Sequence, residues 1–388
     1  MIRSESENKL FQVIAQQILG SADLLWLTEN IQKGLDWPAV TQRAFDEGLA
    51  PLFYYHCRNM NMLEAVQEST KKYLARIYAE TSLINLHLLQ EMTELGKGLE
   101  KRNIQVIVLK GAALLKTVYR DVALRPMEDI DLMVRQEHLN ELKNVLESMG
   151  FTQNRLYPDS FGKGILSIDI HSDLLSSHRI RSRQAILDIR PEDTWSSSIP
   201  INGSSSLYRL SLNVNLIALS FHLLKHRYDR LIWFVDIAES IKASQSMLDW
   251  QDLVAYSRRV RADRLLLYTL LLTKRLIGIN VPDEVLTALG KEELSPAERY
   301  ILRLRLMHVP LGTAMDLLWM FQIRGTGKKI RFIRENIFPR REVMNQIFPD
   351  TSHHFGTFLK RAILVSFQVL TDLLMLFRGV LKGDLPPL

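Results

Sequence analysis

The spacing of apolar residues divides the chain into helical, strand-like and again helical stretches. In residues 37–60 and 73–102 apolar side chains recur at every third or fourth position, which predicts amphipathic helices. Pro38 suits the first turn of one helix, and Gly48 suits its end. From about residue 206 the helical spacing returns and continues to the end of the chain.

Between these regions the pattern changes to short apolar runs separated by helix-forming segments. Strands are predicted at residues 104–109 (IQVIVL), 129–134 (DIDLMV) and 165–175 (ILSIDIHSDLL), the last with a period of two. Residues 111–119 are rich in helix formers, and residues 136–150 form an amphipathic pattern that ends in glycine. Alternating strands and helices indicate a compact α/β core.

Glycine and proline gather at residues 158–164 and 200–203, which predicts loops there. The sequence has no internal repeat and no low-complexity tract. We therefore expect an α+β protein with a small mixed-sheet core at about residues 101–205. This core is embedded between a helical N-terminal region, 1–100, and a larger helical C-terminal region, 206–388.

Two aspartates interrupt the second predicted strand. Side chains alternate along a strand, so Asp129 and Asp131 share one face with Met133, while the apolar residues between them face the other way. Their Cα atoms would lie roughly 6.5 Å apart, close enough for both carboxylates to bind one divalent cation or a pair. Such a cation removes the repulsion between the carboxylates, and Mg²⁺ prefers oxygen ligands.

The third predicted strand offers a further carboxylate. Asp169 shares a face with Ser167, His171 and Asp173 and is our choice for the third acid, with Asp173 in reserve. An acid in the middle of an apolar strand is unfavourable unless something compensates its charge. The alternative is that Asp169 only caps a backbone group or pairs with a basic neighbour.

Upstream, Lys110 and Gly111 lie where the first strand turns into a helix. The N-terminus of a helix presents free N–H groups that suit a phosphate group, glycine allows a close approach, and lysine adds a positive charge. Arg125 precedes the acid pair and has two open interpretations: it binds a triphosphate, or it neutralises the aspartates.

Taken together, these motifs resemble the uncharacterised nucleotidyltransferase family within the polymerase-beta-like nucleotidyltransferase superfamily. The residues that carry the resemblance are LKGAALL (109–115), Tyr119, LRPMEDIDLMV (124–134), MGF (149–151) and DIHSDL (169–174). Weaker similarities lie on both sides and extend it to roughly residues 35–245.

The resemblance implies a metal-dependent nucleotidyltransferase. A nucleoside triphosphate, expected to be ATP, would bind through Mg²⁺ (or Mn²⁺) to Asp129 and Asp131. Asp169 would be the third metal-binding acid, placed to activate the incoming hydroxyl group of the acceptor. The reaction would transfer a nucleoside monophosphate and release pyrophosphate.

The same resemblance makes Lys110, Gly111 and Arg125 nucleotide-binding residues. The sequence departs from the wider superfamily in two ways. Ala112 follows Gly111 where the superfamily has serine, so no hydroxyl is offered there. The spacing from Gly111 to Asp129 is also longer than usual in the superfamily.

A later segment, FHLLKHRYDRLIWFVD, places polar residues at helical spacing. His222 and His226 are four residues apart, as zinc ligands on one helix would be, but no HExxH pattern accompanies them. The other interpretations are a structural polar face or the lining of the nucleotide or acceptor pocket. The resemblance favours the pocket, and we assign His222 and Lys225 to nucleotide binding.

Charge adds one further candidate. The chain has 388 residues with 49 basic and 43 acidic side chains, a net charge of +6 that is compatible with a phosphate-bearing ligand. Much of the excess lies in residues 324–341, either as a solvated basic face or as a phosphate grip for nucleic acid. RGTGKKIR (324–331) is not an ATP loop, because it lacks the first glycine and has Lys329 in place of serine or threonine.

Cysteine content and hydropathy favour a cytoplasmic setting. The single Cys57 cannot form a disulfide within the chain, and the N-terminus lacks a signal-peptide pattern. The apolar stretch 362–377 is interrupted by Gln368, Thr371 and Asp372, so we expect no transmembrane segment.

Two rival functions stay open. One is a non-catalytic nucleotide- or partner-binding module on the same fold; the three intact acids argue against it. The other is a nucleic-acid-directed nucleotidyltransferase, which is not favoured but would follow from a phosphate grip at 324–341. The sequence does not specify the acceptor, which could be a protein, a peptide, a sugar or another small molecule, nor the nucleotide base or the oligomeric state.

Overall fold

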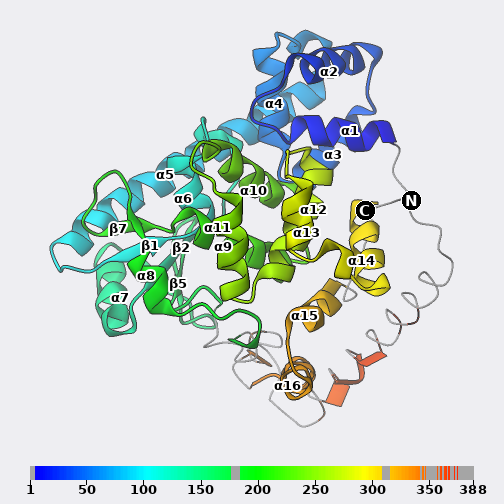
Figure 1. Cartoon of the computed structure of the whole chain (residues 1–388). Helices are drawn as coiled ribbons and strands as arrows, with labels where there is room; N and C mark the ends of the chain where they lie inside the picture. Colours follow the sequence, from blue (N-terminus) through cyan, green and yellow to red (C-terminus); the bar gives the residue numbers. More distant parts are fainter. Residues whose placement is uncertain are drawn as a thin grey trace.

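Figure 1 shows the computed structural model, which describes residues 5–175, 184–307 and 315–340 and scattered positions beyond 340. Residues 5–100 are mainly helical, as predicted. Their elements are α1 (Glu5–Ile14), α2 (Ser21–Lys33), α3 (Trp37–Asp46), α4 (Ala50–Asn59), the 3-10 helix η1 (Leu63–Ala65) and the long α5 (Glu68–Glu100). Pro38 lies in the first turn of α3, and Gly48, with φ of +74°, follows the end of that helix.

The central region forms one mixed sheet. Its strands are β1 (Val106–Val108), β2 (Ile130–Val134), β3 (Thr152–Gln153), β4 (Ser160–Lys163), β5 (Leu166–His171), β6 (Ile199–Pro200) and β7 (Leu207–Arg209). The helical elements between them are α6 (Lys110–Thr117), η2 (Val122–Leu124), η3 (Gln136–His138), α7 (Leu139–Ser148) and α8 (Pro191–Ser196). The strand order is β3-β4-β5-β2-β1-β7-β6, with β2 antiparallel to β1 and parallel to β5. The predicted α+β class with a small mixed sheet is confirmed.

The sheet is larger than the three predicted strands. Residues 158–164 are not simply a loop, because β4 lies within them, and β6 reaches into the predicted loop 200–203. β7 pairs in parallel with β1, so the sheet continues past residue 205. These extra strands are short, and β3 and β6 are exposed, so they lack the apolar alternation that reveals a strand in a sequence.

Each face of the sheet is covered by its own set of helices. Leu132 of β2 belongs to the larger core, to which α5 and α7 contribute. Met133, the next residue, belongs to a smaller cluster with Trp195 of α8 and Val214 of the following helix, α9. The alternation predicted for the second strand is therefore present, with both faces buried.

Beyond β7 the elements of the described C-terminal residues are helices. They are α9 (Leu212–Lys225), α10 (Leu231–Ala243), α11 (Trp250–Arg259), α12 (Asp263–Ile277), α13 (Asp283–Ala288), η5 (Lys291–Glu293), α14 (Pro296–Leu306), α15 (Leu317–Gln322) and α16 (Thr326–Ile337). Figure 1 shows α9 beside the sheet and α15 and α16 at the opposite end of this region. Arg341 and most of the apolar stretch 362–377 lie outside the described residues. Among the helices that are described, none combines the length and apolarity that crossing a bilayer requires.

Candidate active site

The pairing of β2 with β5 brings two of the predicted acids side by side. In this parallel pair Asp131 lies opposite Asp169. Neighbouring strands are about 4.8 Å apart and paired residues project to the same face, so the two carboxylates are neighbours. Asp129 directly precedes β2 and completes the group.

The three carboxylates form a cluster of oxygen ligands. One oxygen atom from each of Asp129, Asp131 and Asp169 lies within 4.8 Å of the other two. Within the described part of the chain, no residue donates a hydrogen bond to the carboxylate of Asp129 or of Asp169 or forms an ion pair with it. Half-buried carboxylates without donors are unfavourable unless a cation compensates them, so the cluster is suited to a hard divalent cation.

Asp131 differs from the other two acids because it has two partners. Lys110 Nζ lies 2.6 Å from its Oδ1 atom, and His171 Nε2 lies 2.7 Å from the same atom. Burial alone would raise the pKa of Asp131, but the Lys110 charge and the His171 hydrogen bond outweigh burial and hold it well below its usual range. Asp131 is therefore ionised at neutral pH, and both partners use one oxygen, which leaves Oδ2 for another ligand.

The neighbouring Asp129 is shifted in the opposite direction. Burial and the negative charge of Asp131 raise the pKa of Asp129 to about 6. A proton or a metal ion stabilises such a carboxylate, and the two compete for it. Two carboxylates whose pKa values are pushed apart are typical of functional sites.

Lys110 and Gly111 lie at the N-terminus of α6, next to the acids. Lys110 has φ of +50°, a left-handed conformation that is uncommon for residues other than glycine and often marks a functional site. A Cβ atom on Gly111 would lie 2.6 Å from Met127 Sδ and 3.3 Å from Arg125 Cζ. Close packing under these two side chains therefore requires glycine at position 111. No side chain caps the helix.

Arg125 is buried and held by a residue far along the chain. Its Nη2 and Nε atoms donate to Asp236 Oδ2 and Oδ1 at 2.8 and 3.2 Å, and Tyr119 Oη donates to the same carboxylate at 2.7 Å. The sequence left two partners open for Arg125, a triphosphate or the aspartates of the second strand. In the structure the bidentate contact is made to a different residue, Asp236 on α10. Arg125 is thus a fixed positive charge beside the acids rather than a mobile one.

His222 and Lys225 lie on α9 and line a narrow cleft together with Lys110 and His171. The cleft has a volume of about 20 Å³, room for a single water, so a larger ligand would have to move its walls apart. Burial and the positive charge of Lys110 lower the pKa of His222 well below its usual range, so this ring is neutral at pH 7. Its Nδ1 atom is buried and has no hydrogen-bond partner among the described residues.

Two contacts of the site were not predicted from the sequence. His171 was placed on the correct face of its strand but was given no role, although it contacts Asp131 directly. Asp173, the reserve acid, instead accepts a hydrogen bond from the backbone N–H of Leu175 at 2.7 Å. The zinc interpretation gains no third ligand, because the metal-capable group found among the described residues is the aspartate cluster.

The fold and the acid cluster define the class of protein: a mixed-sheet α+β protein with a candidate divalent-cation site next to the N-terminus of a helix. A family model described as an uncharacterised nucleotidyltransferase matches residues 33–278, a segment that contains all of the predicted site residues. The chain belongs to this nucleotidyltransferase family. No curated protein and no solved structure matches it.

Proposed function

We propose that the protein transfers a nucleoside monophosphate from a nucleoside triphosphate, with ATP as the first candidate, to a hydroxyl-bearing acceptor, using Mg²⁺ or Mn²⁺. One observation carries the proposal: three carboxylates converge within 4.8 Å in a chain of a nucleotidyltransferase family, and two of them have no donor among the described residues. A bound divalent cation would neutralise phosphate charge and stabilise the transition state of an in-line displacement.

The residues present fit such a cation. The three candidate ligands are all carboxylates, which suits Mg²⁺ or Mn²⁺ better than a soft metal. Asp131 is ionised and offers its Oδ2 atom, while Asp129 has a raised pKa that a cation would relieve. We assign the metal to Asp129, Asp131 and Asp169.

We assign the activation of the acceptor hydroxyl to Asp169. In the proposed reaction the hydroxyl oxygen of the acceptor forms a bond to the α-phosphorus of the nucleotide. The bond from that phosphorus to the oxygen that bridges to the β-phosphorus breaks, and pyrophosphate leaves with the electron pair. Asp169, which has no donor among the described residues, accepts the proton of the hydroxyl as general base.

The positive groups around the acids are assigned to the triphosphate. Lys110 and the free N–H groups at the start of α6, including that of Gly111, would contact phosphate oxygens. Arg125 would contribute a fixed charge, because Asp236 holds it in place. The neutral ring of His222 and the cation of Lys225 would contact the nucleotide from the α9 side of the cleft.

We propose that residues 101–205, extended by β7, form the transferase core framed by the helical regions 1–100 and 206–388. A cytoplasmic setting is consistent with Cys57, which is buried. Burial raises the pKa of its thiol to about 12, so this residue is not a nucleophile at neutral pH.

The experiment that tests the proposal uses α-labelled triphosphates. The protein is incubated with each labelled triphosphate and a cell lysate, with Mg²⁺, with Mn²⁺ or with a chelator. We expect labelled product that depends on the divalent cation and on Asp169. Digestion of the product with protease or nuclease identifies the class of acceptor. Nucleotide binding without labelling of any acceptor would instead support the non-catalytic module.

A further inference from the structure

A second polar cavity lies in the C-terminal region, formed by the start of α12 and the turn between α15 and α16. Its volume is about 270 Å³, just under the roughly 300–1,000 Å³ of typical small-molecule pockets. The lining includes four cations and one carboxylate: Arg261, Arg264, Arg324, Lys329 and Asp263. This cavity shares no lining residue with the cleft beside the three aspartates.

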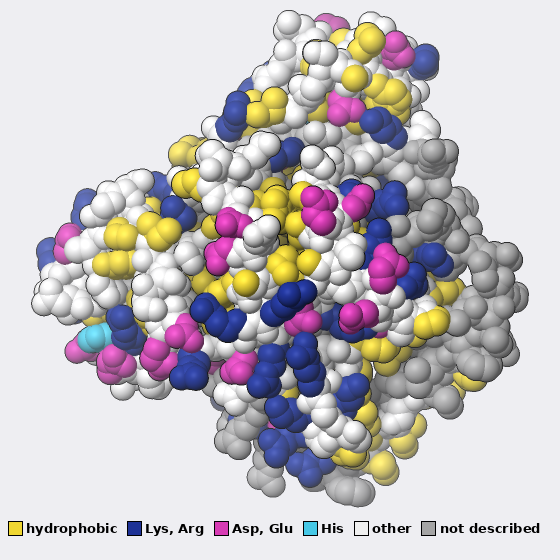
Figure 2. All heavy atoms as spheres, viewed as in Figure 1, with side chains coloured by type: hydrophobic (Ala, Val, Ile, Leu, Met, Phe, Trp, Pro, Cys, Tyr) yellow, Lys and Arg dark blue, Asp and Glu magenta, His cyan; other side chains and the backbone are white. Residues whose placement is uncertain are grey.

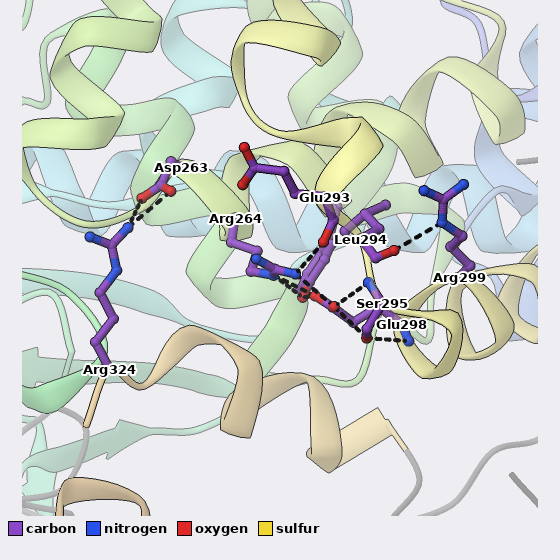
Figure 3. Close-up of polar contacts among 9 residues, drawn as sticks. Asp263, Arg264, Glu293, Leu294, Ser295, Glu298, Arg299 and Arg324 are labelled. Atoms are coloured by element: carbon purple, nitrogen blue, oxygen red, sulfur yellow. Dashed lines mark hydrogen bonds and ion pairs between the residues drawn. The ribbon is translucent and has the colours of Figure 1, made fainter. Parts of the chain in front are cut away.

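Some of this positive charge is already paired. Arg324 Nη2 contacts both carboxylate oxygens of Asp263, at 3.2 and 3.1 Å, and Arg264 contacts Glu298, as Figure 3 shows. Lys329 is half-buried and forms no ion pair with any residue that the structure describes. The guanidinium groups of Arg264 and Arg324 also retain N–H donors beyond those contacts.

The strongest sign of a ligand is Gln322 at the end of α15. Its residue is 4% exposed and it lines the cavity. Both its Oε1 and its Nε2 atoms are buried, and neither has a hydrogen-bond partner in the described part of the chain. A buried amide without partners is unfavourable, because it has lost its hydrogen bonds to water, so a polar ligand that met both atoms would remove this cost.

The first turn of α16 adds further donors at the same cavity. Its N-cap is Gly325, which lines the cavity and has no side chain to cap the helix. The first backbone N–H groups of the helix are therefore available to an anion, and the helix dipole favours negative charge there. Figure 2 shows Lys and Arg side chains gathered in the lower half of the visible face, where Figure 1 places α15 and α16.

We propose that this cavity binds the phosphate group of a small phosphorylated molecule. Lys329, Arg264, Arg324 and the N-terminus of α16 receive the phosphate, and the amide of Gln322 binds a second polar group of the same ligand. A cavity of about 270 Å³ with a buried amide in its lining suits a small molecule, whereas a nucleic acid would need only the exposed basic face of α16. The inference does not depend on nucleotidyl transfer at the aspartate cluster.

Calorimetric titration with inorganic phosphate in chelator-containing buffer at fixed ionic strength tests this site. Lys329→Ala should weaken binding about tenfold, the effect of losing one charge-assisted contact of about 1.4 kcal/mol. Lys328→Ala is the matched control, because Lys328 precedes Lys329 on the same helix and carries the same charge but does not line the cavity. We expect it to change the affinity less than about twofold.

A glucose 6-phosphate titration tests the role of Gln322. Gln322→Leu should weaken the binding of glucose 6-phosphate more than the binding of inorganic phosphate. The melting temperature should not fall, because an apolar side chain replaces a polar one whose hydrogen bonds are unsatisfied. Equal affinity of wild type and this variant for both ligands would overturn the role of Gln322.

Three other results would overturn the site itself. The first is that wild type binds no phosphate at all. Phosphate binding that is lost in Lys110→Ala but kept in Lys329→Ala would place the anion at the aspartate cluster. The third result concerns a single-stranded oligonucleotide. If Lys328→Ala and Lys329→Ala weaken its binding equally, and phosphate does not displace it, α16 carries a nucleic-acid surface instead.

Discussion

Two acidic sites in this protein differ in what surrounds their carboxylates. Glu298 of α14 is 0% exposed and accepts hydrogen bonds from Arg264, Ser295 and Tyr268 (Figure 3 shows the first two). Burial alone would raise the pKa of Glu298, but these donors outweigh it and hold the pKa below its usual value. At the sheet, the carboxylates of Asp129 and Asp169 accept no hydrogen bond from any described residue.

We interpret the difference as one between a structural acid and the acids of the proposed metal site. Removal of one partner from a buried charge with a full set of donors is costly, because it leaves the other partner buried and uncompensated. A cluster of carboxylates that repel one another and lack donors destabilises the fold when it is empty. Such a cluster is expected where a ligand, in our proposal a divalent cation, supplies the missing positive charge.

The largest expected effect concerns Asp169. Asp169→Asn should lower the rate of transfer by roughly 10²-fold or more, because a general base acts in the transition state. The affinity for the Mg-nucleotide should stay within a few-fold, since Asp129 and Asp131 still hold the metal. A labelled-acceptor assay and a binding assay on the same preparation measure both quantities.

Asp173→Asn is the control for this comparison, since Asp173 accepts a backbone hydrogen bond near the same strand. Normal transfer by Asp169→Asn together with loss of transfer in Asp173→Asn would move the third acid to position 173.

The second effect concerns Glu298, the acid whose carboxylate has a full set of hydrogen-bond donors. Glu298→Gln should lower the free energy of unfolding by about 2 kcal/mol, because Arg264 loses its charged partner and the hydrogen bonds to a charged group are weakened. Transfer activity at a temperature where the variant is folded should be unchanged. Denaturant titration and the labelled-acceptor assay check the two expectations, and loss of activity in a folded variant would show that Glu298 is not purely structural.

The third effect concerns Lys110. Lys110→Ala should weaken triphosphate binding about tenfold, the cost of one charge-assisted phosphate contact, and should leave nucleoside binding within about twofold. Lys116→Ala, an exposed lysine on the same helix, serves as the control. Equal losses for triphosphate and nucleoside would make Lys110 a structural partner of Asp131 only.

The smallest effect is a change of stability with pH. The folded protein raises the pKa of Asp129 to about 6, whereas an unfolded aspartate has a pKa of about 3.9. The protonated form of Asp129 is therefore favoured by folding. This contribution to stability is fully present below the pKa of the unfolded aspartate and is lost as the pH rises through the folded pKa of about 6. Asp129→Asn should raise the melting temperature of the metal-free protein by a few degrees at pH 7.5 and by nothing at pH 3.5.

Thermal melts at the two pH values measure this prediction. Saturating Mg²⁺ should make wild type melt at a higher temperature than Asp129→Asn at pH 7.5, because wild type gains stability from the bound ion and the variant does not. An equal gain for both proteins would contradict the assignment of Asp129 to the metal.

The sequence predicted the elements whose side chains have a strong pattern. Asp131 and Asp169 lie on strands with apolar alternation, so their faces could be predicted, and the pairing of β2 with β5 then brings them together. The turn at Lys110 could be predicted because an apolar strand ends there and helix formers follow. The long amphipathic helices on both sides of the sheet were visible for the same reason.

What could not be predicted depends on contacts between distant positions. Asp236 holds Arg125 across 111 residues, and no local pattern links the two. The pairing of Lys110 with Asp131 requires the register of β1 against β2. The short strands β3 and β6 owe their conformation to neighbouring strands rather than to their own two residues.

One calorimetric titration tests the central claim, that the open carboxylates form a metal site that carries the triphosphate. Mg-ATP is titrated into wild type, into Glu298→Gln and into the double variant Asp129→Asn with Asp131→Asn. Circular dichroism first establishes that the double variant is folded, since loss of the Asp129 charge relieves repulsion while loss of the Asp131 charge removes the partner of Lys110. The account predicts Mg²⁺-dependent binding by wild type and by Glu298→Gln, and none by the double variant. Unchanged affinity of the folded double variant for Mg-ATP would contradict it.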